Sequence, residues 1–137
     1  MSNDPNNPCL FCRPSVKAEW LLSENEHAML WADSNPVSNG HCLAIPHRHV
    51  ADYFDLTREE REAIEALLHQ RRATLMAEDD SIDGFNVGVN CGKAAGQSIR
   101  HVHVHLIPRR FGDNPKPQGG VRHVIPDKAY YQRKNKD

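Results

Sequence analysis

The sequence HVHVHLI at residues 101–107 places a histidine at every second position, with a valine between each pair. Successive side chains of a β-strand point to opposite faces, so His101, His103 and His105 share one face and the aliphatic residues share the other. Because a strand rises about 3.3 Å per residue, neighbouring histidines on that face stand roughly 6.6 Å apart. The pattern predicts a strand over residues 99–108 that packs one face into the core and presents three imidazoles on the other.

Three imidazoles on one face need a chemical explanation, because packing alone favours aliphatic residues and every ring brings nitrogens that need partners. One interpretation is a metal site of three histidines whose bound water hydrolyses esters. The other makes the central His103 a nucleophile that attacks phosphorus. The spacing of the histidines does not choose between them. The preceding Gly96-Gln97-Ser98 offers backbone N–H groups, an amide and a hydroxyl that suit phosphate oxygens, which favours phosphate chemistry.

Three further segments read as strands. Residues 27–32 and 41–46 are expected to form an antiparallel pair, because they are joined by a segment dense in turn-forming residues. Residues 83–90 alternate larger apolar side chains with small or polar ones, as a half-buried strand does.

One long helix is expected over residues 56–78. Its apolar residues recur at helical spacing, and Thr57 and Glu60 have the spacing of a capping box, which satisfies free N–H groups at a helix start. A strand-rich order with one long helix predicts an α+β fold, with an antiparallel sheet of about five strands and the helix packed on it.

The length of 137 residues predicts one domain over residues 1–137. Its core is expected at about residues 9–110. The tail over residues 111–137 contains proline and glycine, and a short strand is expected at residues 120–125.

The composition also bounds the partners. A net charge of −1 gives no electrostatic basis for binding bulk nucleic acid. No apolar run approaches the roughly 18 residues of a membrane-spanning helix, and the first residues do not resemble a secretion signal. A cytoplasmic, reducing location is therefore expected, where the close pair Cys9 and Cys12 indicates metal binding or redox chemistry before a structural disulfide.

The alternating histidines resemble the signature of the histidine triad (HIT) family of nucleotide-binding hydrolases and transferases. The Gly-Gln-Ser lead before them, Asn90 at a strand end, Asp33 after a strand and Gly40-His41 before the next strand are similar to that family as well. The resemblance covers about residues 9–110 and implies the HIT-like fold.

The resemblance also implies roles for individual residues. His103 would attack the α-phosphorus of a nucleotide and form a nucleotidyl-histidine intermediate that water then releases. His105 would face the phosphate or the leaving group, His101 completes the catalytic triad, and Asp33 would receive the ribose hydroxyls. The other substrate-binding residues that it implies are His41, Asn90, Gln97 and Ser98.

The cysteine pair needs two more ligands to close a tetrahedral site. A DNA-binding zinc finger would need two histidines three to five residues apart, about a dozen residues after Cys12, and His27 stands alone in that window.

A branch of the family with an N-terminal cysteine pair resembles galactose-1-phosphate uridylyltransferase, and this likeness implies a structural zinc site. Such a closed site leaves no position for a reactive water and leaves His103 free of metal. His47 competes with His49 as a ligand, and a cysteine pair without metal is the alternative. The implied ligands are Cys9, Cys12, His49 and His101.

The expected activity is hydrolysis at the α-phosphate of a (di)nucleoside polyphosphate. The tail after the triad resembles bacterial members described as diadenosine tetraphosphate hydrolase-like. The alternatives are a nucleoside phosphoramidase, a nucleotidyltransferase, a module that binds AMP without turnover, and the three-histidine metallohydrolase considered above. Within the family, the core usually pairs through its helix and an adjoining strand, so a homodimer is expected.

Overall fold

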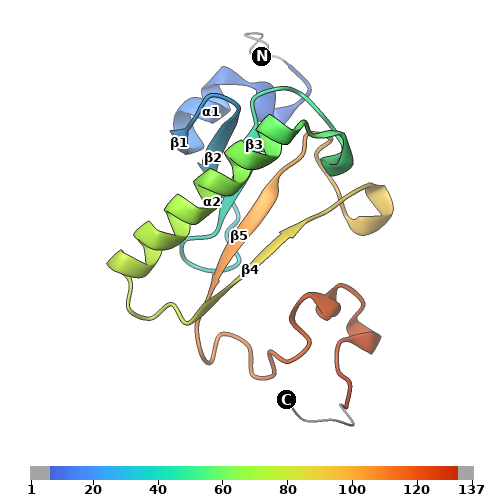
Figure 1. The fold of residues 1–137 in the computed structure, drawn as a ribbon. Helices are drawn as coiled ribbons and strands as arrows, with labels where there is room; N and C mark the ends of the chain where they lie inside the picture. The colour runs from blue at the N-terminus through green and yellow to red at the C-terminus, as the bar shows by residue number, and fades with distance from the viewer. Residues whose placement is uncertain (1–6, 133–137) are drawn as a thin grey trace.

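The computed structural model describes residues 7–132, and the two ends of the predicted domain, residues 1–6 and 133–137, lie outside the described residues. Five antiparallel strands form one sheet in the order β1-β2-β3-β5-β4 (Figure 1). The predicted α+β class and antiparallel sheet are therefore confirmed. The strands are β1 (Leu21–Glu24), β2 (Ala28–Ala32), β3 (Cys42–Pro46), β4 (Gly84–Val89) and β5 (Val104–Arg109).

The long helix α2 (Arg58–Glu78) lies across one face of the sheet (Figure 1). It begins after Thr57, whose hydroxyl accepts from the Glu60 N–H while the Glu60 carboxylate accepts from the Thr57 N–H, so the predicted capping box is confirmed. Ile64 and Leu67 pack from this helix into the main core. The 21-residue α2 carries many arginines and glutamates, and no helix within residues 7–132 is long and apolar enough to cross a membrane.

The opposite face of the sheet is covered by the N-terminal segment. It contains a short 3-10 helix, η1 (Leu10–Cys12), followed by helix α1 (Pro14–Trp20). Phe11 from η1 packs with residues of β2 and β3 in a second apolar cluster. The sequence did not predict α1 or β1, because both are short and neither shows a strong periodic pattern. This second layer provides part of the wall of the functional pocket described below.

The period-two alternation at the histidines holds, but the strand is shorter than predicted. Val102, Val104 and Leu106 are buried in the main core, as expected for one face. β5 begins only at Val104, where its pairing with β3 and with the end of β4 begins, and the Val102 N–H donates instead to the Val50 carbonyl in the loop after β3.

The short strand predicted at residues 120–125 is wrong, because this segment forms the 3-10 helix η4 (Gly120–Val124). Gly119, just before it, has a φ of +90°, a conformation that L side chains rarely adopt. A Cβ at Gly119 would also clash with the Ala129 carbonyl oxygen. The close return of the buried Ala129 over Gly119 bends the tail into consecutive 3-10 turns and leaves no straight strand.

Glu60 also fastens the loop after β3 to the start of α2. Its carboxylate accepts two hydrogen bonds from the Arg48 guanidinium, at 2.8 and 3.1 Å, although its own side chain is almost fully buried. These bonds lower the pKa of the Glu60 carboxyl. Charge-assisted bonds to a buried carboxylate are costly to remove, since the remaining groups lose their partner.

We predict that Glu60→Gln lowers the free energy of unfolding by about 1–3 kcal/mol, because an amide cannot accept from both Arg48 and the Thr57 N–H with full strength. Urea denaturation at pH 7 measures the change. Glu59→Gln, which alters an exposed carboxylate in the same helical turn, is the control and should stay within about 0.5 kcal/mol of the parent. Equal losses in the two variants would contradict this role for Glu60.

Candidate functional site

A pocket of about 380 Å³ opens on the sheet face that carries the histidines. Part of its lining is apolar and comes from side chains of η1, α1, β2 and β3. The polar part of the lining includes Asp33, Asn90, Ser98, His103 and His105. A largely apolar site with a few convergent polar groups is typical of a small-molecule pocket.

His103 lies in the wall of this pocket with 8% of its surface exposed. Its Nδ1 is 2.9 Å from the His101 carbonyl oxygen. A carbonyl oxygen only accepts, so Nδ1 carries the hydrogen and a neutral His103 has its lone pair on Nε2. The ring is thus oriented by the backbone of its neighbour, and its second nitrogen is left as a base or nucleophile.

His105, next along the same face, takes part in a chain of hydrogen bonds with His41 and Asp33. The Val37 N–H donates to His41 Nδ1 at 3.1 Å, so the hydrogen of a neutral His41 is on Nε2. That nitrogen is 2.9 Å from His105 Nδ1 and 3.3 Å from Asp33 Oδ2. His105 Nδ1 therefore accepts, and its own hydrogen is on Nε2. His105 offers the pocket a donor where His103 offers an acceptor.

Burial keeps these supporting imidazoles neutral. It lowers the pKa of His105 to about 4, and the neighbouring His103 and His41 rings act in the same direction. Burial also lowers the pKa of His41, against the opposing attraction of the Asp33 carboxylate. Because both rings are neutral at pH 7, each keeps one donating and one accepting nitrogen, which the hydrogen-bond chain requires.

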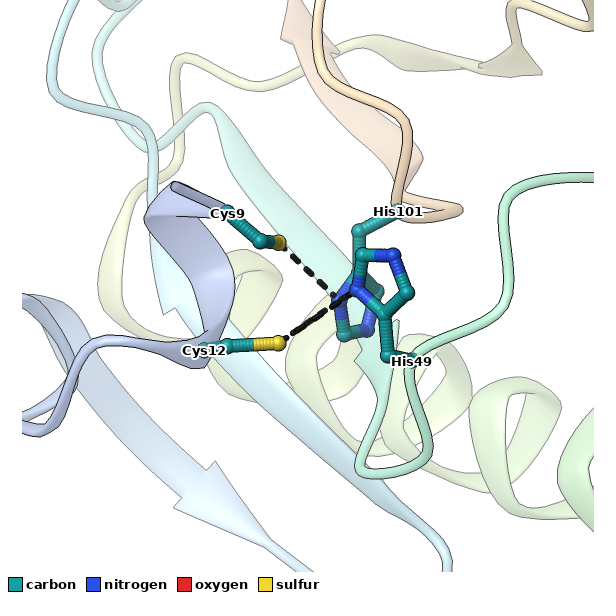
Figure 2. A group of neighbouring side chains, drawn as sticks. All are labelled: Cys9, Cys12, His49 and His101. Atoms are coloured by element: carbon teal, nitrogen blue, oxygen red, sulfur yellow. Dashed lines mark hydrogen bonds between the residues drawn. The ribbon is translucent and has the colours of Figure 1, made fainter. Parts of the chain in front are cut away.

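A second cluster consists of two cysteines and two histidines, Cys9, Cys12, His49 and His101, whose side chains point toward one another (Figure 2). Cys9 Sγ is 3.4 Å from His101 Nδ1, and Cys12 Sγ is 3.4 Å from His49 Nδ1. The two Nδ1 atoms are 3.2 Å apart, and all four ligand atoms lie within 4.8 Å of one another. Two sulfur and two nitrogen donors at this separation form a ligand set that suits a tetrahedral metal ion.

The tautomer of His101 fits metal binding. Its Nε2 is 2.8 Å from the Pro46 carbonyl oxygen and therefore carries the hydrogen, so the lone pair of Nδ1 points toward the two sulfurs. A ligating histidine that donates its other N–H to a backbone carbonyl is a common arrangement in metal sites.

The group formed by Asp33, His41 and His105 also has three donor atoms within 4.8 Å of one another, but it fits a metal poorly. Ligation through His41 Nε2 would require the hydrogen to move to Nδ1, where it would face the Val37 N–H at 3.1 Å. Two donors would then oppose each other. This group is therefore a hydrogen-bond chain, and neither cluster found among residues 7–132 includes His103.

The choice left open between His47 and His49 is resolved by the structure. His47 Nε2 is 2.9 Å from the Asn25 carbonyl oxygen, and its ring lies against Glu24 instead of the cysteines. His49, two residues later, reaches the cluster from the same loop. His101 was expected both in the triad and among the metal ligands. It is fully buried, its ring lies in the cysteine–histidine cluster, and it contacts His103 through its backbone carbonyl.

The loop before the triad differs from expectation in one respect. Ser98 lines the pocket, as does Asn90. The Gln97 side chain does not, because its amide donates to the Ala51 and Ile99 carbonyls and accepts from the Gly92 N–H. The Gly96 and Gln97 N–H groups bond to carbonyls within the same loop. Gln97 thus holds the loop in place, and Ser98 presents a hydroxyl to the pocket.

The apolar side chains that line the pocket were not predicted from the sequence. Leu10 and Phe11 stand between the two cysteines, and Val16 and Trp20 follow in α1. The apolar Leu-Phe pair inside a short cysteine spacing is the signal that could have indicated it, since metal-binding turns do not need large apolar spacers.

Comparison with known proteins agrees with this geometry. The HIT domain family matches residues 15–112. An uncharacterized 16.1 kDa HIT-like protein of Mycoplasma pneumoniae is 36% identical over 107 residues, covering 76% of this chain and 73% of that protein. Adenylylsulfatase HINT3 of Arabidopsis thaliana is 33% identical over 120 residues, covering 82% of this chain and 57% of that protein.

Among solved structures, a zinc-bound histidine triad family protein of Mycobacterium smegmatis superposes with a TM-score of 0.65 at 31% identity. The match covers 89% of this chain and 94% of that one. The family match, the sheet with its long helix and the alternating histidines at the pocket together establish that the chain belongs to the HIT family.

Proposed function

We propose that this protein is a nucleotide hydrolase that cleaves at the α-phosphate of a (di)nucleoside polyphosphate through a nucleotidyl-histidine intermediate on His103. The observation that carries the proposal is the hydrogen bond from His103 Nδ1 to the His101 carbonyl oxygen, which leaves the Nε2 lone pair of a pocket residue free. An imidazole that only bound a ligand would not need its tautomer held in this way.

In the first step, His103 Nε2 forms a bond to the α-phosphorus while the bond from phosphorus to the leaving oxygen breaks. The ring becomes positively charged, and its Nδ1–H remains donated to the His101 carbonyl, whose dipole stabilises that charge. His105 donates a hydrogen bond from its Nε2–H to the departing oxygen and keeps its proton, which stabilises the charge that develops on the leaving phosphate. Water then attacks the phosphorus and releases a proton to solvent, the electron pair of the N–P bond returns to Nε2, and a nucleoside monophosphate is released.

The lining of the pocket suits the base, the ribose and the phosphate of a nucleotide. The apolar side chains would contact the base, and the Asp33 carboxylate would accept hydrogen bonds from the ribose hydroxyls. Asn90 and Ser98 would bind phosphate oxygens. Direct contact between Gln97 and phosphate stays a prediction from the family resemblance, and the contacts of its amide support a role in shaping the loop. A volume of about 380 Å³ is compatible with a mononucleotide unit.

The leaving group decides among the related activities. The same intermediate would serve a nucleoside phosphoramidase, and a sugar phosphate in place of water would make the protein a nucleotidyltransferase. The adenylylsulfatase relative supports hydrolysis at an adenylyl group. The hydrogen-bonded Asp33, His41 and His105 chain supports turnover over simple binding of AMP, because a binding module has no need of an oriented proton donor.

The metal at the cysteine–histidine cluster is proposed to be zinc in a structural role. Two thiolates and two imidazoles favour zinc, and four protein ligands leave no open position for a reactive water. Zinc would join the N-terminal segment to the loop after β3 and to the residue that orients His103. The free cysteines support a cytoplasmic, reducing location, where thiol ligands persist.

A homodimer is proposed through β4 and α2. β4 is an edge of the sheet, and Val87 on it is 57% exposed. A groove between this strand and α2 is lined by apolar side chains that include Tyr53, Leu56 and Leu68. An edge strand beside an apolar groove can pair with a second copy. The net charge of −1 gives no support to binding of bulk nucleic acid.

We predict that His103→Ala lowers turnover of diadenosine tetraphosphate by about 10⁴-fold or more, because the nucleophile is lost. Intact-mass spectrometry of reactions quenched with alkaline denaturant, in which the N–P bond is stable, should show an adenylyl adduct on the parent protein and none on the variant. His123→Ala, a change to a half-buried histidine of η4 that does not line the pocket, is the control and should keep the adduct. An adduct on His103→Ala would refute the assigned nucleophile.

We predict that Cys9→Ser loses zinc and lowers the midpoint of thermal unfolding, because one of four ligands is removed. His103→Ala and His47→Asn should each retain one zinc per chain. Elemental analysis of the purified proteins measures the metal. Zinc retained by Cys9→Ser and lost by His103→Ala would place the ion on the triad and contradict the structural site.

We predict that the stability of the protein falls as the pH is lowered from about 6.5 to about 4. Unfolded histidine takes up a proton near pH 6.5, whereas folded His105 resists protonation until about pH 4. The unfolded state therefore binds more protons within this window, and stability is fully present only above it. Urea denaturation across the window should show a smaller loss for His105→Asn, and an unchanged loss would contradict the assignment.

A further inference from the structure

We infer that the metal ion at Cys9, Cys12, His49 and His101 controls nucleotide affinity, because the two residues between the cysteines form part of the nucleotide pocket. This inference rests on the function proposed above. It makes the cysteine–histidine cluster a coupled site, in which metal and nucleotide strengthen each other's binding.

The coupling begins in the 3-10 turn η1. Leu10 and Phe11 line the pocket. The flanking Cys9 and Cys12 direct their sulfurs toward the two histidines of the cysteine–histidine cluster. The Cys12 N–H donates to the Cys9 carbonyl at 3.1 Å, so the turn between the two ligands is closed. With only two residues between the ligands, their backbone is set by the positions of the sulfur atoms.

Phe11 carries the coupling to the reactive histidine. Its side chain is 3% exposed, and its ring packs edge-on against three other rings. The ring centroids are 5.1 Å from His103, 5.9 Å from His101 and 5.2 Å from Trp31. His103 and Trp31 also line the pocket, so movement of Phe11 changes the pocket both at the reactive histidine and at its apolar lining.

His101 provides a second route between the two sites. Its Nδ1 faces the metal cluster, and its carbonyl oxygen holds His103 Nδ1. One residue thus contributes a side chain to one site and a backbone group to the other. The cysteine sulfurs lie 3.4–3.5 Å from imidazole nitrogens, and sulfur is a weak hydrogen-bonding group. Bonds to a metal would therefore restrain this turn beyond the packing of Phe11.

Linkage requires the coupling to be reciprocal. If metal raises nucleotide affinity by a given factor, nucleotide raises metal affinity by the same factor. Coupling between sites is typically 5- to 150-fold, and contact through a single buried ring favours about 10-fold here.

Calorimetry with AMP tests the inference in the zinc-loaded and chelator-treated parent protein. AMP affinity is expected to fall about 10-fold on metal removal. Phe11→Ala in its zinc-loaded form should show a loss of affinity while keeping its zinc, and metal removal should then cost it less than it costs the parent, because only the route through His101 remains. Leu67→Ala is the matched control. It truncates a buried side chain of α2, on the other face of the sheet, and its AMP affinity should depend on the metal as that of the parent does.

A second measurement does not depend on the stability of the metal-free protein. The rate at which a chromogenic chelator removes zinc from the parent protein is followed with and without saturating AMP, and AMP is expected to slow it. The inference is overturned if zinc-loaded protein binds AMP but removal of zinc leaves that affinity unchanged, or if AMP leaves the release rate unchanged. Failure of the zinc-loaded parent to bind AMP would instead refute the proposed function.

Discussion

The fully buried imidazole of His101 is the contact on which the site depends. Its Nε2–H is fixed by the Pro46 carbonyl, and this bond aims Nδ1 at the two cysteines. Its own carbonyl sets the tautomer of His103. One residue at the start of the β5 segment therefore connects the end of β3, the N-terminal turn and the pocket. Displacement of this ring would disturb the metal ligands and the nucleophile together.

The sheet places the remaining polar groups around that residue. Register between β3 and β5 sets Leu43 opposite His105, and both line the pocket. The aliphatic residues of the β5 segment face α2, so the helix packs on one face of this strand. The N-terminal turn η1 packs on the other face of the sheet. The Arg48–Glu60 pair holds the loop that carries His49 against the start of the helix. The site is thus assembled from segments that are far apart in the sequence.

Much of this arrangement could be predicted from local patterns, because period-two alternation and the capping box are short-range signals. The four-residue cluster at Cys9 and His101 followed from the family resemblance, and the structure brings those residues together. The tautomers of His103 and His41 could not be predicted, since they depend on carbonyl and N–H groups positioned by tertiary packing. The same holds for Gln97, whose amide is taken up by backbone groups from another loop. The strand predicted in the tail was wrong, because the close approach of Ala129 to Gly119 overrides local strand propensity.

The ligands of the cysteine–histidine cluster are also widely separated along the chain, with a sequence separation of 92 between Cys9 and His101. An ion that joins them closes a long loop, and the entropy of the unfolded chain falls when such a loop is closed. His49 follows β3 and His101 precedes β5, so the pairing of these two strands brings the two histidines to the same end of the sheet. An ion bound there would tie the segment of Cys9 and Cys12 to both strands, so its removal is expected to loosen that segment before the sheet itself.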